Sequence, residues 1–188
     1  MFRRLGFFGL LLCLAAGCSG PPTKEHDQAT AALAAARAAD AATYAPDDLQ
    51  AAQGLLDKYD QFVADHDYRQ ALGTAIDARD RAYEAARQAG IQKTAARTAL
   101  QSAITDLEAL VKTASTRLGS AAPPRLTAAA ADRLRTAMHA GEKALQEARS
   151  AMNDEKYRDG LSRVQPATED LRKALAPTEA GRRGRGHS

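Results

Sequence analysis

The apolar positions of this chain recur every three or four residues in three separate stretches. The first contains Leu49, Ala52, Leu56, Tyr59, Val63 and His66. The second contains Leu100, Ile104, Leu107, Val111, Ala114 and Leu118, and the third contains Tyr157, Leu161, Val164, Thr168, Leu171 and Leu175. Such spacing places each set on one helix face, and its heptad form is what antiparallel helices use to pack against each other.

Prolines and turn residues divide the chain into helices. Pro46, followed by two aspartates, suits the first turn of a helix over residues 46–64. Asp65-His66-Asp67 has the composition of a turn. The next helix is expected over 68–118, with Gly90 as the likeliest bend.

Residues 119–124, which include two prolines, predict a break. A fourth helix is expected over 125–153, with these residues facing inward: Leu126, Ala130, Leu134, Met138, Leu145 and Met152. A fifth should begin near Asp154, kink at Pro166 and end at Pro177.

Composition favours helices with a thin core. After residue 17, 42 of 171 residues are alanine, the strongest helix former. Residues 24–43 form a helix by propensity, although Leu33 is their only large apolar side chain. We therefore expect an all-α fold of elongated antiparallel helical hairpins, bundled or tetratricopeptide-like, with about five helices and no β-sheet.

Two segments, starting at His66 and at Glu155, resemble each other. Each contains Tyr-Arg at an expected helix start, and each follows a helix opened by proline. A degenerate duplication of hairpins 44–118 and 123–176 would explain this, and so would the shared alanine-rich composition.

The N-terminus has the form of an export signal. Arg3 and Arg4 precede an apolar run over residues 5–14, which is too short to span a bilayer. The small residues 15–17 and then Cys18 follow. No other cysteine occurs after this point, so Cys18 would be a lone thiol in an oxidising compartment.

This segment resembles the lipobox of bacterial lipoproteins, although Ala15 stands where leucine is usual. The resemblance implies a signal peptide over residues 1–17, lipidation of Cys18 and a tether over 18–23. Ser19 resembles the pattern sent to the outer membrane, facing the periplasm. The alternative is an ordinary secretory signal cut near Gly17.

A second resemblance covers roughly residues 28–90. The pattern from Tyr44-Ala45-Pro46 to Ala52, and then Asp67-Tyr68 with Ala71, is similar to bacterial envelope proteins that carry the domain of unknown function DUF4398. That family implies a two-helix, tetratricopeptide-like hairpin, often lipidated, and it implies no catalytic residue.

Charge argues against a nucleic-acid partner. The net charge of +3 comes from the ends, because Arg3, Arg4, Arg182, Arg183 and Arg185 lie there and the rest is nearly neutral. We expect the helical domain to span 24–176 and the Arg/Gly tail, 177–188, to be disordered. This tail could contact an anionic component of the envelope.

No arrangement of residues in the sequence predicts catalysis, a metal or a cofactor. The histidines are scattered, and no metal-ligand spacing or nucleophile motif occurs. Asp65-His66-Asp67 could hold a weak metal ion, but helix-end chemistry explains it better.

Three functions remain open in order of preference. The first is a lipid-anchored scaffold that binds an envelope protein or braces the envelope. The second is a carrier of a small ligand or lipid in a groove between helices. An enzyme is the least favoured.

Overall fold

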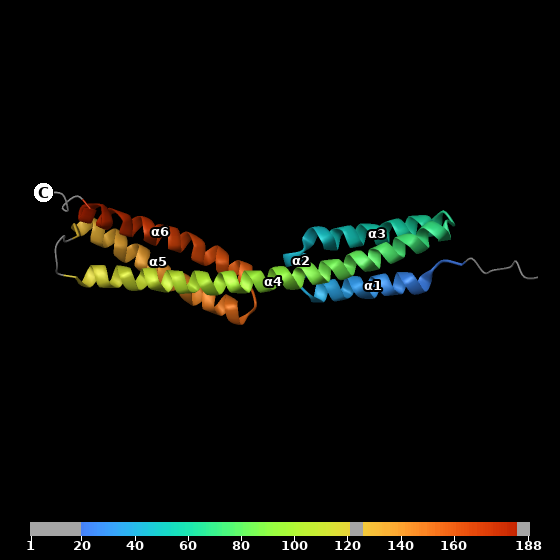
Figure 1. Ribbon diagram of the computed structural model, residues 1–188, viewed down its shortest axis with the longest axis horizontal. Helices are drawn as coiled ribbons and strands as arrows, with labels where there is room; N and C mark the ends of the chain where they lie inside the picture. The colour runs from blue at the N-terminus through green and yellow to red at the C-terminus, as the bar shows by residue number, and fades with distance from the viewer. Residues whose placement is uncertain (1–19, 121–125, 184–188) are drawn as a thin grey trace, which may run out of the picture. The chain divides into compact units, whose positions relative to one another are not determined.

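The computed structural model describes residues 20–120 and 126–183, and side chains as far as residue 176. These residues form six helices and no strand, which confirms the all-α fold class (Figure 1). The helices are α1 (Thr23–Ala38), α2 (Ala41–Tyr44), α3 (Pro46–Ala64), α4 (Tyr68–Gly119), α5 (Ala128–Asn153) and α6 (Tyr157–Arg183).

The chain divides into two compact units, and the boundary lies inside α4. Unit 1 comprises residues up to Gly90, and unit 2 begins at Ile91. Unit 1 therefore contains α1, α2, α3 and the first part of α4, whereas unit 2 contains the rest of α4 with α5 and α6. The boundary lies within the segment 44–118, which the sequence grouped as one hairpin.

Unit 1 is packed mainly through alanine. Six alanines of α4 form a buried heptad series, here named the alanine seam: Ala71, Ala75, Ala78, Ala82, Ala85 and Ala89. Ala78 and Ala82 share a core cluster with Ala29, Ala32 and Leu33 of α1 and with Ala52 and Leu56 of α3. Methyl side chains let helix backbones approach closely, so α1 packs although Leu33 is its only large apolar residue.

Unit 2 is packed through larger side chains. The largest fully buried side chains of the described residues all belong to this unit: Leu100, Leu107, Leu134, Leu171 and Val164. Each fully buried leucine contributes about 1.5–3 kcal/mol through the hydrophobic effect. The heptad positions predicted on 100–118 and on 157–175 are all buried or half-buried, so both of these seams are confirmed.

Glycines bring the helices of unit 2 close together. A Cβ atom on Gly160 of α6 would lie 2.6 Å from Leu100 Cδ2 of α4, and one on Gly141 of α5 would lie 3.1 Å from Val111 Cγ2. Gly141 is itself buried in α5. Both glycines are therefore packing positions, which the sequence patterns did not identify.

The two hairpins have the same turn. The N–H of His66 donates to the carbonyl of Val63, and that of Asp67 donates to Phe62; Glu155 and Lys156 repeat these bonds to Met152 and Ala151. His66 and Glu155 adopt φ of 58° and 59°. This is a Schellman motif, in which the residue after the helix end is left-handed. The two segments that resemble each other in sequence therefore begin in the same backbone conformation.

The expected single helix over 24–43 is wrong. The chain breaks at Ala39 and Asp40, and Asp40 adopts the left-handed conformation with φ 61°. Aspartate tolerates this conformation better than most residues. Helix propensity could not locate the break, because alanine surrounds it on both sides.

The predicted end at Pro177 is also wrong, because the α6 backbone continues to Arg183. A proline removes one backbone N–H donor, but the residues after it can still adopt helical angles. Residues 177–183 of the tail expected to be disordered are therefore helical, and 184–188 lie outside the described residues. The α6 helix also includes Pro166, and the α4 helix includes Gly90, so neither residue ends its helix.

Candidate functional site

The Asp65-His66-Asp67 segment lies in the turn between α3 and α4, as predicted. Asp67 Oδ1 accepts a hydrogen bond from the Gln70 backbone N–H at 3.1 Å, which is an N-cap of α4. The Nδ1 atom of His66 lies 3.1 Å from the Tyr68 hydroxyl. Both polar side chains are thus used locally. In residues 20–120 and 126–183, no three His, Cys, Asp or Glu side chains gather as a metal site would require.

Cys18, the predicted lipidation site, lies outside the described residues, as does the signal segment over 1–17. The first described helix begins at Thr23, five residues after Cys18. None of the helices that the structure describes combines the length and the apolar character needed to cross a bilayer. Of the tail arginines, Arg182 and Arg183 belong to the α6 backbone and Arg185 lies outside.

An aromatic contact joins α1 to the far end of α3. The rings of His26 and Tyr59 stack with centroids 4.6 Å apart, and His26 Nδ1 lies 3.6 Å from Asp27 Oδ1. Burial raises the pKa of Tyr59, and the carboxylates of Asp60, Asp27 and Glu25 raise it further. Tyr59 therefore stays a neutral packing residue, and this contact is structural.

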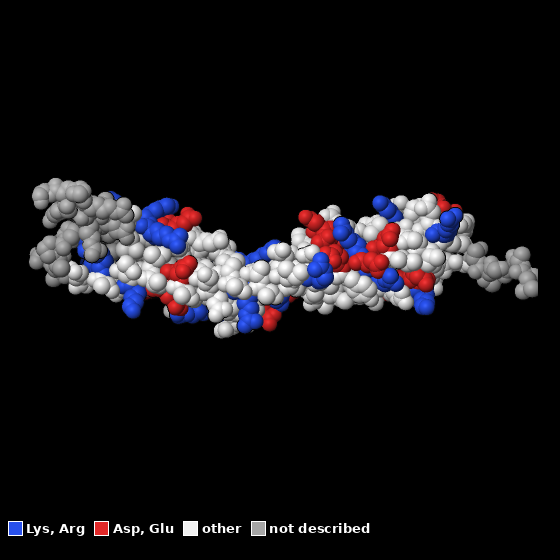
Figure 2. Space-filling model, in the orientation of Figure 1, with Lys and Arg blue, Asp and Glu red and all other residues white. Residues whose placement is uncertain are grey.

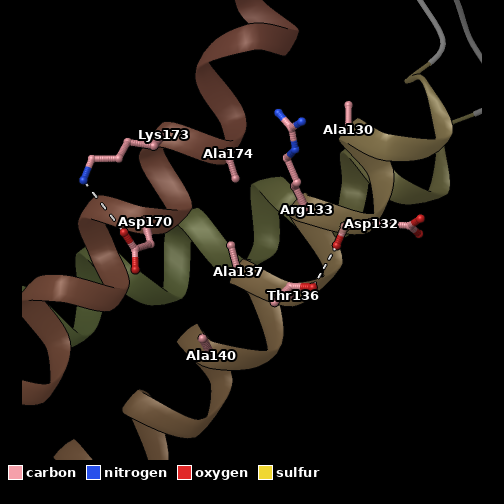
Figure 3. A pocket seen from close by; sticks show the side chains of 9 residues that line it. All are labelled: Ala130, Asp132, Arg133, Thr136, Ala137, Ala140, Asp170, Lys173 and Ala174. Carbon is pink, nitrogen blue, oxygen red and sulfur yellow. Dashed lines mark hydrogen bonds and ion pairs between the residues drawn. The ribbon is translucent and has the colours of Figure 1, made fainter.

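An open groove of about 660 Å³ lies between α5 and α6 in unit 2. We call it the α5–α6 groove; it is lined by Ala130, Asp132, Arg133, Thr136, Ala137, Ala140, Asp170, Lys173 and Ala174. Figure 3 shows Ala137 of α5 and Ala174 of α6 facing the space between the two helices, with Asp132 pointing away. The floor is therefore made of methyl groups, without a bulky side chain.

The charged residues that line the groove differ in their partners. Lys173 Nζ lies 3.8 Å from Asp170 Oδ1, and Asp132 pairs with Arg135 at 2.6 Å. Arg133 has no hydrogen-bond or ion-pair partner in the described part of the chain. Its guanidinium group is therefore available to a carboxylate from outside.

A second surface lies on α4 in unit 1. We call Leu72, Ile76 and Tyr83 the α4 strip; their spacing of four and seven residues places them on one side of the helix. Leu72 is 39% exposed and Tyr83 is 57% exposed, while Ile76 is half-buried. The alanines of this part of α4 enter the core, and its bulky apolar side chains lie at the surface.

The two units carry opposite charge. Residues 20–90 contain seven Lys and Arg against twelve Asp and Glu, a net charge of −5. Residues 91–188 contain 17 against 11, a net charge of +6. Figure 2 shows acidic side chains gathered over α3 and the adjoining part of α4. The small net charge of the whole chain, +3, does not reveal this division.

One exposed ion pair in unit 1 has a well-defined geometry. Arg87 donates to both carboxylate oxygens of Glu84, at 2.6 and 2.9 Å, and Gln88 adds a bond of 2.8 Å. These hydrogen bonds, chiefly from Arg87, lower the pKa of Glu84 to about 2. The carboxylate is thereby held ionised, which suits a surface ion pair and not a proton donor.

Sequence reasoning missed both the groove and the strip. The strip has a signal in the sequence, since Leu72, Ile76 and Tyr83 lie one position after members of the alanine seam. The groove has none, because it depends on how α5 and α6 are paired.

Comparisons of the chain with protein-family models, with curated proteins and with solved structures found no match.

Proposed function

We propose that this protein is a non-catalytic helical scaffold of the bacterial envelope, anchored by lipid on Cys18 to the outer membrane and facing the periplasm. Its partners would be another envelope protein or an anionic envelope component, and it would need no cofactor. In this proposal the protein binds no nucleic acid and converts no substrate.

One observation carries the proposal: Cys18 follows an apolar run and three small residues, and α1 begins five residues later. A tether this short would keep unit 1 near the membrane surface. Several acyl chains on one cysteine would bind a bilayer effectively permanently, at about 0.8 kcal/mol for each buried methylene.

Two features of the described residues support the scaffold part of the proposal. Many ionisable side chains lie on exposed helix faces as local ion pairs, for example between Arg135 and Asp132 and between Lys143 and Glu147. The α4 strip and the α5–α6 groove offer contact surfaces of different character. A protein that works by contact requires such surfaces and needs no reactive group.

The anchor is tested by mass spectrometry of the mature N-terminus from bacterial cells, compared with the Cys18→Ser variant. We expect an acylated Cys18 in the native chain and a shift of the variant out of the membrane fraction. An unmodified thiol at position 18 in a freely soluble protein would reject the anchor.

The partner class is tested by crosslinking intact cells that produce the protein at native abundance. We expect a specific envelope partner, with its yield reduced in the Cys18→Ser variant. Recovery of no partner, or equal recovery with and without the anchor, would contradict the scaffold.

A carrier of a small ligand or lipid is the second candidate, and the α5–α6 groove is the observation that favours it. Its volume of about 660 Å³ is in the range of ligand pockets. However, it is open and floored by alanine, whereas carriers enclose their ligands with bulky apolar walls. Mass spectrometry of molecules that copurify with the native protein would separate the two candidates, since a carrier should retain one ligand class.

A further inference from the structure

The α4 strip projects bulky side chains, and the α5–α6 groove offers open space. The strip presents two exposed bulky side chains, Leu72 and Tyr83, with Ile76 between them. The groove presents four alanines and an open volume of about 660 Å³. Bulky anchors that fill pockets near the centre of an interface supply most of its binding energy.

The strip is not left over from an incomplete core. Between residues 68 and 90, every buried residue of α4 is an alanine of the alanine seam, and the four larger apolar residues are half-buried or exposed: Tyr68, Leu72, Ile76 and Tyr83. The buried core of unit 1 along this part of α4 is therefore made by alanines, and the exposed Leu72 and Tyr83 remain available for an intermolecular contact.

Charge supports the same pairing. Residues 20–90 of unit 1 carry a net charge of −5 and residues 91–188 carry +6, so unit 1 of one molecule attracts unit 2 of another. At the surfaces themselves, Asp77 follows Ile76 and Arg133 lines the groove. Neither side chain has a hydrogen-bond or ion-pair partner among the described residues.

We propose that the α4 strip of one molecule packs into the α5–α6 groove of a second copy of this chain, with Asp77 of the first copy beside Arg133 of the second. This inference goes beyond the scaffold proposal and does not depend on lipidation. Each copy contains both surfaces, so each copy can contribute either one to the contact.

Photocrosslinking in cells tests the contact on the full chain. The photoreactive residue p-benzoylphenylalanine replaces Tyr83. As a control, the same probe replaces Gln50, an exposed residue of α3. We expect a product of twice the chain mass from position 83, with the attachment mapped to residues 130–140 or 170–174. Crosslinks from position 83 only to other proteins, or none, would overturn the proposal.

Filling the groove provides a second test. Ala137→Trp places a large ring on the groove floor, and Ala34→Trp adds the same ring at an exposed position of α1. We expect the first variant to lower the crosslinked dimer by about tenfold and the second to leave it unchanged. Equal dimer yields from both variants, with unchanged helical circular dichroism, would overturn the assignment to the groove.

A charge exchange tests the pair of Asp77 and Arg133. Arg133→Asp and Asp77→Arg should each lower the dimer yield through repulsion between like charges, and the double variant should recover it. Both residues lie at the surface, so neither change should unfold a unit. If the double variant is as weak as the single variants, Asp77 and Arg133 do not meet and that part of the proposal fails.

Discussion

Units 1 and 2 use the same helical periodicity with different side chains. In unit 1 the buried face of α4 consists of six alanines, whereas in unit 2 the same helix buries Leu100 and Leu107. A methyl group fills little space and allows close helix approach, while a leucine interdigitates and removes more apolar area from water. Heptad spacing thus specifies which face of a helix is buried, whereas the size of the side chains specifies how that face is packed.

The two cores should therefore respond to opposite kinds of substitution. Unit 2 should be most sensitive to the loss of side-chain volume, and unit 1 to its addition. Hydrogen exchange measured along the full chain reports each unit separately, so it can test this difference without separating the units.

The largest effect is expected from Leu134→Ala in unit 2. Leu134 is fully buried, so its truncation leaves a cavity and should lower the free energy of unfolding by about 2–5 kcal/mol. Hydrogen exchange should accelerate in α5 and α6. If the exchange accelerates equally in α1 and α3, the two cores are not independent.

The next effect is expected from Ala82→Leu in unit 1. Ala82 is fully buried and shares its cluster with Leu33 and Leu56. The added volume should lower the free energy of unfolding by about 1–3 kcal/mol through overpacking. Denaturant unfolding measures the loss of stability, and faster hydrogen exchange in α1 and α3 would place it in unit 1. A stabilised variant would mean that the alanine seam leaves unfilled space.

A smaller effect separates two glycines in helix interiors. Gly160→Ala should destabilise unit 2 by about 1–3 kcal/mol, because the new Cβ would meet buried Leu100. Gly73→Ala meets nothing within 4 Å and should stabilise unit 1 by about 0.5–1 kcal/mol. Thermal unfolding of both variants tests the contrast, and two changes of the same sign would contradict it.

The smallest effect concerns the acidic surface of unit 1. The pKa of Glu84 is lowered from 4.5 to about 2, so the contribution of its ion pair is present above pH 4.5 and is lost as the pH falls toward 2. Because the pair is exposed, the change in stability should be slight. An NMR titration should show the low pKa, and Arg87→Gln should return it toward 4.5. A normal pKa in the unaltered chain would show that Arg87 does not hold this geometry.

The sequence predicted the parts of the fold that depend on local chemistry. Pro46 and the Asp65-His66-Asp67 turn located both ends of α3, and the leucine heptads of unit 2 located its core. The break at Asp40 was not predictable, because a left-handed aspartate between alanines has no distinctive pattern. The alanine seam was hidden for a related reason, since alanine also occupies many exposed positions.

For the candidate site, the sequence contributed Cys18 and the structure contributed the surfaces. Cys18 could be selected because its neighbours form a linear pattern. The α5–α6 groove could not, because Ala137 and Ala174 belong to different helices and meet only after these have paired. Arg133 likewise has no partner among the described residues because Asp132 pairs with Arg135 and Asp170 pairs with Lys173, which the sequence does not show.

The short Schellman turn after α3 has a consequence for which residues of α4 become interior. The alanine seam and the α4 strip differ by a single position, and one residue rotates a helix by about 100°. With three residues between α3 and α4, the connection has no slack to absorb a change in length. One residue fewer there would turn Leu72, Ile76 and Tyr83 toward α1 and α3 and carry the alanines outward, so the length of this turn selects which face of α4 becomes interior.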